Sequence, residues 1–189
     1  MRKDFGVQTW LYPMPVLIVA TYDENGRPDA MTAAWGGIHD TNEIGVCIDP
    51  GHKSAENLQK KRCFTVAVAD AAHLAACDYV GIVSAHDEPE KFSKAGFHAT
   101  RSHFVDAPLI DELPMALECR LLSYDGKTGC AVGEIVNVSA DSSILDADGS
   151  IDPEKFSPLC FDPVHHLYRT LGTVAGQAFQ AGMQLKERR

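Results

Sequence analysis

The sequence has little positive charge and no long apolar run. Lys and Arg total 17 against 26 Asp and Glu, which gives a formal net charge of -9 at pH 7. Because nucleic-acid phosphates are bound by clustered Lys and Arg, this balance argues against a nucleic-acid partner. The two basic groups, Lys60 to Arg62 and Lys186 to Arg189, are interpreted as solvated surface. The apolar run Val16 to Ala20 is too short for a membrane span or a signal-peptide core, so we expect a cytoplasmic protein without a membrane partner.

The six cysteines lack the spacing of a metal or disulfide framework. They lie far apart, with no CxxC, and several are inside apolar runs. Such thiols are usually reduced core residues in a cytosolic protein. His73 and Cys77 are spaced by one helical turn, as two metal ligands on one helix face would be. Two ligands do not make a site, so we predict no metal and interpret them as a polar-edge histidine and a core thiol.

Motifs for several enzyme classes are also missing. The chain has no Gly-x-Ser-x-Gly elbow, HExxH, P-loop or dinucleotide fingerprint, which argues against a hydrolase or a Rossmann domain. Asp141 to Ser150 alternates acids but lacks the spacing and closing Glu of an EF-hand, and we interpret it as a surface loop. Without repeats or low-complexity linkers, residues 1–189 are predicted to form a single domain, whose core the 45% hydrophobic residues can fill.

What the sequence contains is a mainly β pattern with inserted helices. Expected strands share short apolar or alternating runs, two pairs being joined by turns at Asp23 to Gly26 and Asp125-Gly126. They are Val16 to Tyr22, Pro28 to Ala34, Glu43 to Ile48, Cys63 to Val68, Met115 to Tyr124 and Thr128 to Val138. Expected helices run from a Ser54 cap to near Lys61, from Ala71 to Val80 between an Asp70 cap and a Gly81 stop, and from Pro89 to Lys94, closed by Gly96.

The segment from Ala30 to Asn57 carries the features of a ligand site. Its first half is rich in Ala and Gly, so backbone amides can approach a planar ligand, and Trp35 can form an aromatic wall. Its second half places Lys53 and Ser54 at a predicted helix start, where free amides, an ammonium and a hydroxyl can hold a phosphate. The structural alternative is a strand end packed in the core and an ordinary solvated lysine.

Eight segments, each short and mostly apolar, follow one another along most of the chain. They are Pro13 to Thr21, Asn25 to Trp35, His52 to Asn57, Phe64 to Val68, Asp87 to Phe92, Ala107 to Ile110, Met115 to Arg120 and Gly133 to Val136. In this order they resemble the flavin reductase-like family of FMN-binding split β-barrels, particularly its flavoredoxin-type branch.

The resemblance implies FMN as cofactor and assigns residues to it. It places Thr32, Ala33, Ala34 and Trp35 along the ribityl chain and ring, Cys47, Ile48 and Asp49 beside the ring edge, and His52, Lys53 and Ser54 at the phosphate. Asn57 would hold the phosphate turn, and Lys91 and Phe92 would lie near the flavin. Hydride transfer to flavin needs no obligatory acid or base, so no catalytic residue is named.

The late segment leaves the substrate side open. Tyr168 with Leu171-Gly172 resembles the aromatic and Leu-Gly residues near the family's site, but the spacing and the preceding His165-His166 are unusual. Neighbouring histidines in a strand would point to opposite faces, so at most one would face the ligand. Residues 160–189 are expected to form a C-terminal tail that packs on the barrel or on a dimer partner.

The resemblance leaves two classes of function open, with a third as a weaker alternative. The first is an NAD(P)H-dependent oxidoreductase that passes electrons through bound FMN to free flavin or another small acceptor. The second is a flavoredoxin-like electron carrier reduced by a redox protein partner, and the third is a non-redox flavin-binding module. NADH or NADPH would enter the flavin site transiently. A homodimer is expected from the resemblance, and the apolar stretch Phe161 to Leu167 could cover a neighbouring subunit or pack within the chain.

Overall fold

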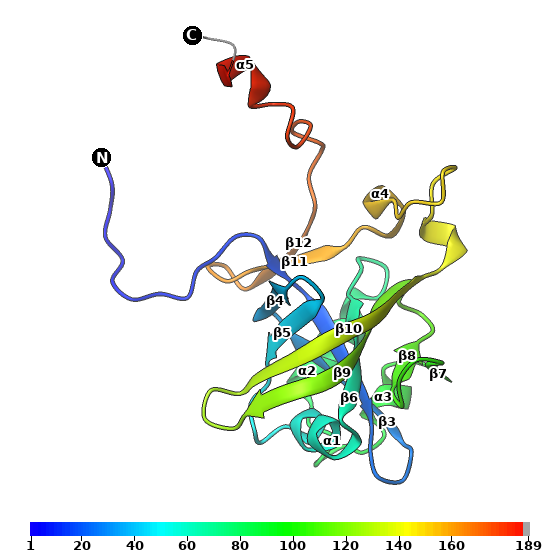
Figure 1. Ribbon diagram of the computed structural model, residues 1–189. Helices are drawn as coiled ribbons and strands as arrows, with labels where there is room; N and C mark the ends of the chain where they lie inside the picture. The colour runs from blue at the N-terminus through cyan, green and yellow to red at the C-terminus, as the bar shows by residue number, and fades with distance from the viewer. Residues whose placement is uncertain (187–189) are drawn as a thin grey trace.

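The computed structural model describes residues 1–186 and is built around one seven-stranded antiparallel sheet (Figure 1). The strand order is β3-β2-β6-β9-β10-β5-β4. The strands are β2 (Leu17–Tyr22), β3 (Pro28–Ala33), β4 (Gly36–Asp40), β5 (Glu43–Cys47), β6 (Cys63–Val68), β9 (Met115–Asp125) and β10 (Cys130–Ala140). The sheet curls, and the mainly β fold predicted from the sequence is confirmed.

Both faces of this sheet are buried at its strands β2 and β6, whereas β4 is largely exposed. Every residue of β2 is buried, which explains its continuous apolar run. On one face α1 (Lys53–Lys61) contributes Leu58 to the cluster around Phe64. On the other face α2 (Leu74–Ile82) and α3 (Lys91–Lys94) contribute Val80 and Phe92 to a second cluster. Full burial of each such side chain stabilises the fold by about 1.5–3 kcal/mol.

Three predicted helix boundaries are wrong. Ser54 does not cap α1, because its hydroxyl donates to Asp29 and the N-cap residue is His52. Helix α2 begins at Leu74 rather than Ala71, and it continues through Gly81 instead of stopping there. A Cβ on Gly81 would lie 2.8 Å from the Cβ of Thr32, so the glycine permits close packing of α2 on β3.

The remaining elements surround the main sheet. They are β1 (Met14–Pro15), β7 (Ala99–Arg101), β8 (Pro108–Ile110), the 3-10 helix η1 (Ser142–Ile144), α4 (Pro153–Phe156), β11 (Leu159–Asp162), β12 (Leu167–Thr170) and α5 (Met183–Lys186). Strands β1, β11 and β12 form a small sheet, and β7 pairs with β8. The described part of the C-terminal segment therefore contributes a hairpin before it leaves the body of the molecule (Figure 1).

The two adjacent histidines lie in the turn between β11 and β12, so the argument that neighbours in a strand point to opposite faces does not apply to them. His166 adopts a positive φ of 54° and its ring stacks on Phe161 with an interplanar angle of 2°. His165 Nδ1 lies 3.0 Å from Asp162 Oδ2. Both imidazoles thus have partners within the hairpin itself.

Candidate functional site

Strand β3 connects two hollows on the surface of the protein. It is an edge strand of the main sheet, with β2 as its neighbour in that sheet. A hollow of about 200 Å³ at its beginning is lined by Asp23, Arg27, Pro28, Asp29, Lys53, Asn57, Ala85 and Pro89. A second hollow, of about 210 Å³, is lined at the other end of β3 by Val16, Thr32, Ala34, Asp78, Gly81, Ile82, Phe161 and Tyr168. We call these the polar hollow and the apolar hollow.

The two hollows lie close together along the edge strand β3. Asp29 lies in the first and Thr32 in the second, three residues apart on one antiparallel strand. At about 3.4 Å per residue, their Cα atoms are separated by about 10 Å. A molecule with a polar, charged end and a flat, apolar end matches the chemistry of the two hollows in this order.

The polar hollow is organised by the buried carboxylate of Asp29. Ser54 Oγ donates to Asp29 Oδ2 at 2.6 Å, and Lys91 Nζ lies 3.3 Å from Asp29 Oδ1. The Lys91 ammonium also donates to the carbonyl oxygens of Val80 at 3.1 Å and Val83 at 2.9 Å. With both charged side chains about 4% exposed, this ion pair fixes β3 against α1, α3 and the end of α2.

Two buried acceptor atoms in the residues lining the polar hollow lack a hydrogen-bond donor among the described residues. They are Asp29 Oδ1 and Asn57 Oδ1. The Lys91 ammonium is close enough to Asp29 Oδ1 for an ion pair, but without hydrogen-bond geometry. A buried acceptor without a donor costs about 1–3 kcal/mol, so Asn57 Oδ1 favours a donor from outside the described residues, whereas the Lys91 charge compensates Asp29 Oδ1.

The polar hollow also holds two cations, each with a carboxylate partner. Lys53 Nζ lies 3.0 Å from Glu56 Oε1, and Arg27 Nη1 lies 3.2 Å from Glu90 Oε1. Hydrogen bonds from Lys60 and then Lys53 lower the pKa of Glu56 to about 2, so this partner is ionised at neutral pH. An anionic group in the hollow would compete with surface carboxylates for these cations, at a modest cost because exposed ion pairs contribute only about 0–1 kcal/mol.

The apolar hollow is lined by hydrophobic side chains and a small set of polar groups. Thr32 donates its hydroxyl to the Cys77 carbonyl oxygen inside α2. Tyr168 Oη donates to Asp78 Oδ1 at 2.6 Å. Burial raises the pKa of Tyr168, and the hydrogen bond to Asp78 raises it further, so the phenol stays protonated at neutral pH. The hollow thus presents a fixed hydroxyl beside the apolar side chains of Val16 and Phe161.

The structure brings part of the predicted site together at these hollows. Lys53 and Asn57 line the polar hollow, and Thr32 and Ala34 line the apolar hollow. Ser54 donates a hydrogen bond to Asp29, and Lys91 forms an ion pair with the same carboxylate. Ser54 and Lys91 do not line the hollow themselves, and the role of all six residues in binding stays a prediction.

Other predicted site residues have structural contacts of their own. Ala33 and Ile48 belong to the core cluster around Phe64, and Phe92 is 3% exposed and packs on Phe97. The remaining four lie along the chain that leads from β3 to α1. Trp35 is 55% exposed, and its carbonyl accepts from the amide of Cys47 at 2.8 Å. Asp49 Oδ1 accepts from the amide of Gly51 at 2.8 Å, and His52 is the N-cap of α1.

Sequence reasoning did not single out Arg27, Asp29 or Asp78. Asp29 was visible as a charged residue inside the predicted strand Pro28 to Ala34, which is otherwise mostly small and apolar and is an unusual place for an unpaired carboxylate. Asp78 had no such signal, because its partner Tyr168 is 90 residues away in the chain.

Two further properties follow from the described residues. No group of three or more His, Cys, Asp or Glu side chains in residues 1–186 is arranged to hold a metal ion. Across the same residues, no helix has the length and apolar character needed to cross a membrane.

Comparison with known proteins identifies the family. The family model described as a flavin reductase like domain matches residues 9–165. The chain belongs to the flavin reductase-like family. This match covers most of the sequence, including both hollows except for Tyr168.

Solved structures support the same assignment. Flavoredoxin of Desulfovibrio vulgaris (Miyazaki F) is 35% identical, with a TM-score of 0.91, and the match covers 96% of this chain and 100% of that chain. Flavoredoxin from Methanosarcina acetivorans is 25% identical, with a TM-score of 0.87 and coverage of 97% and 100%. The predicted split-barrel fold and flavoredoxin-type resemblance are therefore confirmed. An FMN-binding domain of a flavin reductase-like enzyme from Shewanella baltica OS155, 19% identical over 86% of this chain and 88% of that one, shares the fold with a TM-score of 0.75.

Curated relatives match shorter stretches. An uncharacterised protein of Aquifex aeolicus is 34% identical over 38% of this chain and 38% of its own length. An uncharacterised protein of Aeropyrum pernix is 28% identical over 59% of this chain and 43% of its own length. The chain thus matches less than half the length of either relative.

Proposed function

We propose that this flavin reductase-like protein binds FMN along β3, with the phosphate and ribityl chain in the polar hollow and the ring toward the apolar hollow. FMN is the cofactor that the family assignment supports. The observation that carries this placement is the chemistry of the polar hollow, where Lys53 and Arg27 lie with Asn57, whose buried Oδ1 has no hydrogen-bond donor among the described residues. Lys53 and Arg27 supply the charge that a phosphate needs at the same hollow.

The chain's own groups orient the cofactor and control access to it. Thr32 and Ala34 present a narrow strand edge to a flat ring, while Val16 and Phe161 exclude water from one side. The phenol of Tyr168 donates its proton to Asp78, so its oxygen is available to the apolar hollow only as an acceptor. When bound, FMN supplies the redox chemistry, and the protein supplies position and electrostatics.

The proposed activity is electron transfer from NADH or NADPH through bound FMN to free flavin or another small acceptor. The family assignment supports an oxidoreductase. Since the sequence has no dinucleotide fingerprint, the nicotinamide nucleotide would bind transiently over the flavin. Similarity to two flavoredoxins favours the second candidate, an electron carrier reduced by a redox protein partner.

The visible spectrum of the purified protein tests these functions. A flavin spectrum that bleaches promptly on anaerobic addition of NADH or NADPH would support the reductase. A flavin that remains oxidised until dithionite or a reduced carrier protein is added would support the electron carrier. Protein that stays colourless after incubation with FMN, and shows no change in FMN fluorescence, would refute both.

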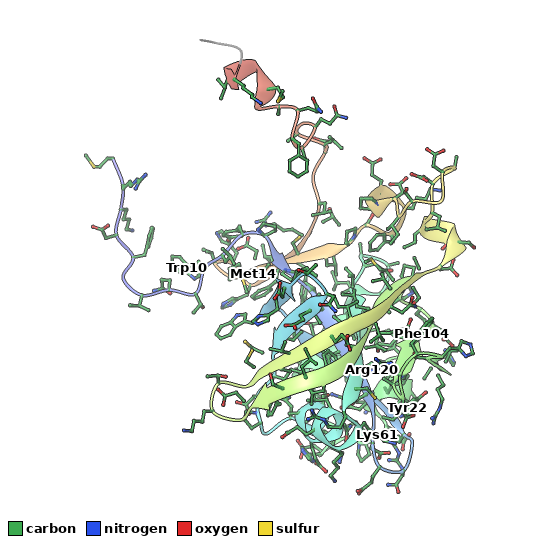
Figure 2. The ribbon with its side chains drawn as sticks, in the orientation of Figure 1. Trp10, Met14, Tyr22, Lys61, Phe104 and Arg120 are labelled. Carbon is green, nitrogen blue, oxygen red and sulfur yellow. The ribbon has the colours of Figure 1, made fainter. Side chains whose placement is uncertain are left out.

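The proposal includes a homodimer. Residues 1–13 and the segment after β12 extend from the body, and Trp10 lies on the first of these arms, away from the main sheet (Figures 1 and 2). They expose Phe5, Trp10, Val174 and Phe179. Exposed apolar side chains on extended arms favour burial against a second copy. Phe161, in contrast, packs within the chain, so the stretch Phe161 to Leu167 is not wholly available to a partner.

Sedimentation equilibrium tests the dimer by comparing the full chain with a variant that lacks residues 1–10 and 174–189. The full chain is expected to be dimeric and the shortened chain largely monomeric, because it has lost apolar contact area. A full chain that sediments as a monomer at all concentrations would refute the dimer. A cytoplasmic location is also part of the proposal, supported by the six free thiols.

A further inference from the structure

Two cysteines lie directly opposite each other where β5 and β10 pair. In the antiparallel register of these strands, Cys130 faces Cys47. The amide of Ile48 donates to the carbonyl of Gly129 at 2.7 Å, and this bond joins the residues immediately outside the cysteine pair. Such a bond marks the pair itself as non-hydrogen-bonded, the class in which opposite Cα atoms are about 4.5 Å apart and the side chains are closest.

This geometry suits a disulfide. Cysteines in disulfides have Cα separations of about 4.4–6.8 Å, and the expected separation here lies within that range. Side chains of directly opposite residues also leave the sheet on the same face. Burial raises the pKa of the Cys47 thiol, and the nearby Cys130 thiol raises it further.

The other cysteines lack such a partner among the described residues. Cys63, Cys77 and Cys119 are buried. Cys160 is partly exposed, but it is paired in register with Pro15 on one side and Arg169 on the other. Cys47 is exposed and Cys130 partly exposed, so an oxidant in solution can reach this pair while the buried thiols are protected.

We propose that Cys47 and Cys130 form a two-electron redox site that closes reversibly to an intramolecular disulfide by exchange with a low-molecular-weight disulfide. The Cys47 thiolate attacks one sulfur of the small disulfide, whose S–S bond breaks and releases one thiolate. The Cys130 thiolate then attacks Cys47 in the mixed disulfide and releases the second. Two protein thiols are oxidised, the small disulfide is reduced to two thiols, and the two protein protons pass to the released thiolates.

The location gives this redox site a consequence at the candidate FMN site. The amide of Cys47 donates to the carbonyl of Trp35, directly after Ala34 of the apolar hollow. Closing the disulfide would fix the end of β5 to β10, next to the chain that leads from Asp49 into α1. This consequence rests on the proposed function, whereas the thiol chemistry itself does not.

Peptide mapping of the full chain tests the redox site. Reduced protein is incubated anaerobically with oxidised glutathione, alkylated and digested with trypsin without reductant. Cleavage is expected to give peptide 4–53, containing Cys47, and peptide 128–155, containing Cys130, each with no other cysteine. The expected product is the cross-linked pair of these peptides and the loss of two of the six titratable thiols. Reduced glutathione in excess should restore both thiols.

Single variants separate this result from ordinary glutathionylation. Cys130→Ser should accumulate a stable glutathione adduct on Cys47, because the resolving thiol is missing. Cys160→Ser is the matched control and should form the same cross-linked peptide as the wild type. The proposal is overturned if the wild-type protein keeps all six thiols, or if it carries stable glutathione on Cys47 without the cross-link. These readouts do not depend on FMN, so they can fail or succeed independently of the proposed function.

Discussion

Replacing Lys91 by Met should destabilise the protein more than any exposed lysine replacement on the same helix. The Lys91 side chain is 4% exposed, pairs with Asp29 at 3.3 Å and donates to two carbonyl oxygens. Removing one member of a buried ion pair costs about 3–5 kcal/mol, because the other charge stays buried without its partner. At about 2–4 °C per kcal/mol for a chain of this size, the melting temperature should fall by roughly 6–20 °C.

Lys94→Met is the control for this prediction. Lys94 also lies on α3 and pairs with Glu88 at 2.7 Å, but its side chain is 59% exposed. An exposed pair contributes about 0–1 kcal/mol, so this variant should remain close to the wild type. Urea unfolding followed by circular dichroism gives the free energy of unfolding for each protein.

A double-mutant cycle with Asp29→Asn isolates the pair. The combined variant should lose at least about 1 kcal/mol less than the sum of the single losses, because removing both charges leaves no unpaired ion. Additivity within about 0.5 kcal/mol would refute the reasoning, since it would show that Lys91 and Asp29 do not stabilise each other.

Three further predictions test the site and its surroundings. Lys53→Ala should weaken FMN binding about 10–100-fold, as expected for loss of a charge-assisted hydrogen bond, while the control Lys60→Ala should leave the affinity nearly unchanged. Equal FMN dissociation constants for Lys53→Ala and the wild type, measured by fluorescence titration, would contradict the phosphate placement. Gly81→Ala should lower the free energy of unfolding by about 1–3 kcal/mol, because the added Cβ would clash with Thr32 of β3. The control Gly126→Ala should leave the free energy of unfolding nearly unchanged, because a Cβ there meets nothing within 4 Å. The folded-state pKa of Glu56 is lowered to about 2, so the difference in free energy of unfolding between wild type and Glu56→Gln should be constant above about pH 5 and vanish as the pH falls toward 2. Urea unfolding at several pH values measures this difference, and a difference that grows on acidification would contradict the prediction.

Local signals predicted much of the sheet. The strand Cys63–Val68 was predicted with its observed bounds, because the run is apolar and β-branched between polar residues. The turn at Asp125-Gly126 lies in the predicted hairpin between β9 and β10. Strand β4 was missed, since Gly36, Gly37 and His39 give it neither an alternating pattern nor strand propensity, and it depends on pairing with β5.

The site was predictable only where its chemistry is local in sequence. Lys53 and Asn57 lie one turn apart on one helix, and both line the polar hollow. Phe92 follows Lys91 directly, but on α3 its ring lies in the core while the ammonium reaches Asp29. The Tyr168 to Asp78 contact joins β12 to α2 across 90 residues, and no local pattern in the sequence encodes such a contact.

Lys91 caps the C-terminal end of α2 although it lies on a different helix, α3. The last turn of α2 contains no basic residue, yet its end has a positive charge, because Lys91 donates to the carbonyls of Val80 and Val83. An anion that drew this ammonium into the polar hollow would uncap α2, whose Gly81 and Ile82 line the apolar hollow. In that case the two ends of β3 would be energetically coupled through one lysine. The coupling would be reciprocal, so a change that tightens the last turn of α2 would also weaken the hold of Lys91 on an anion.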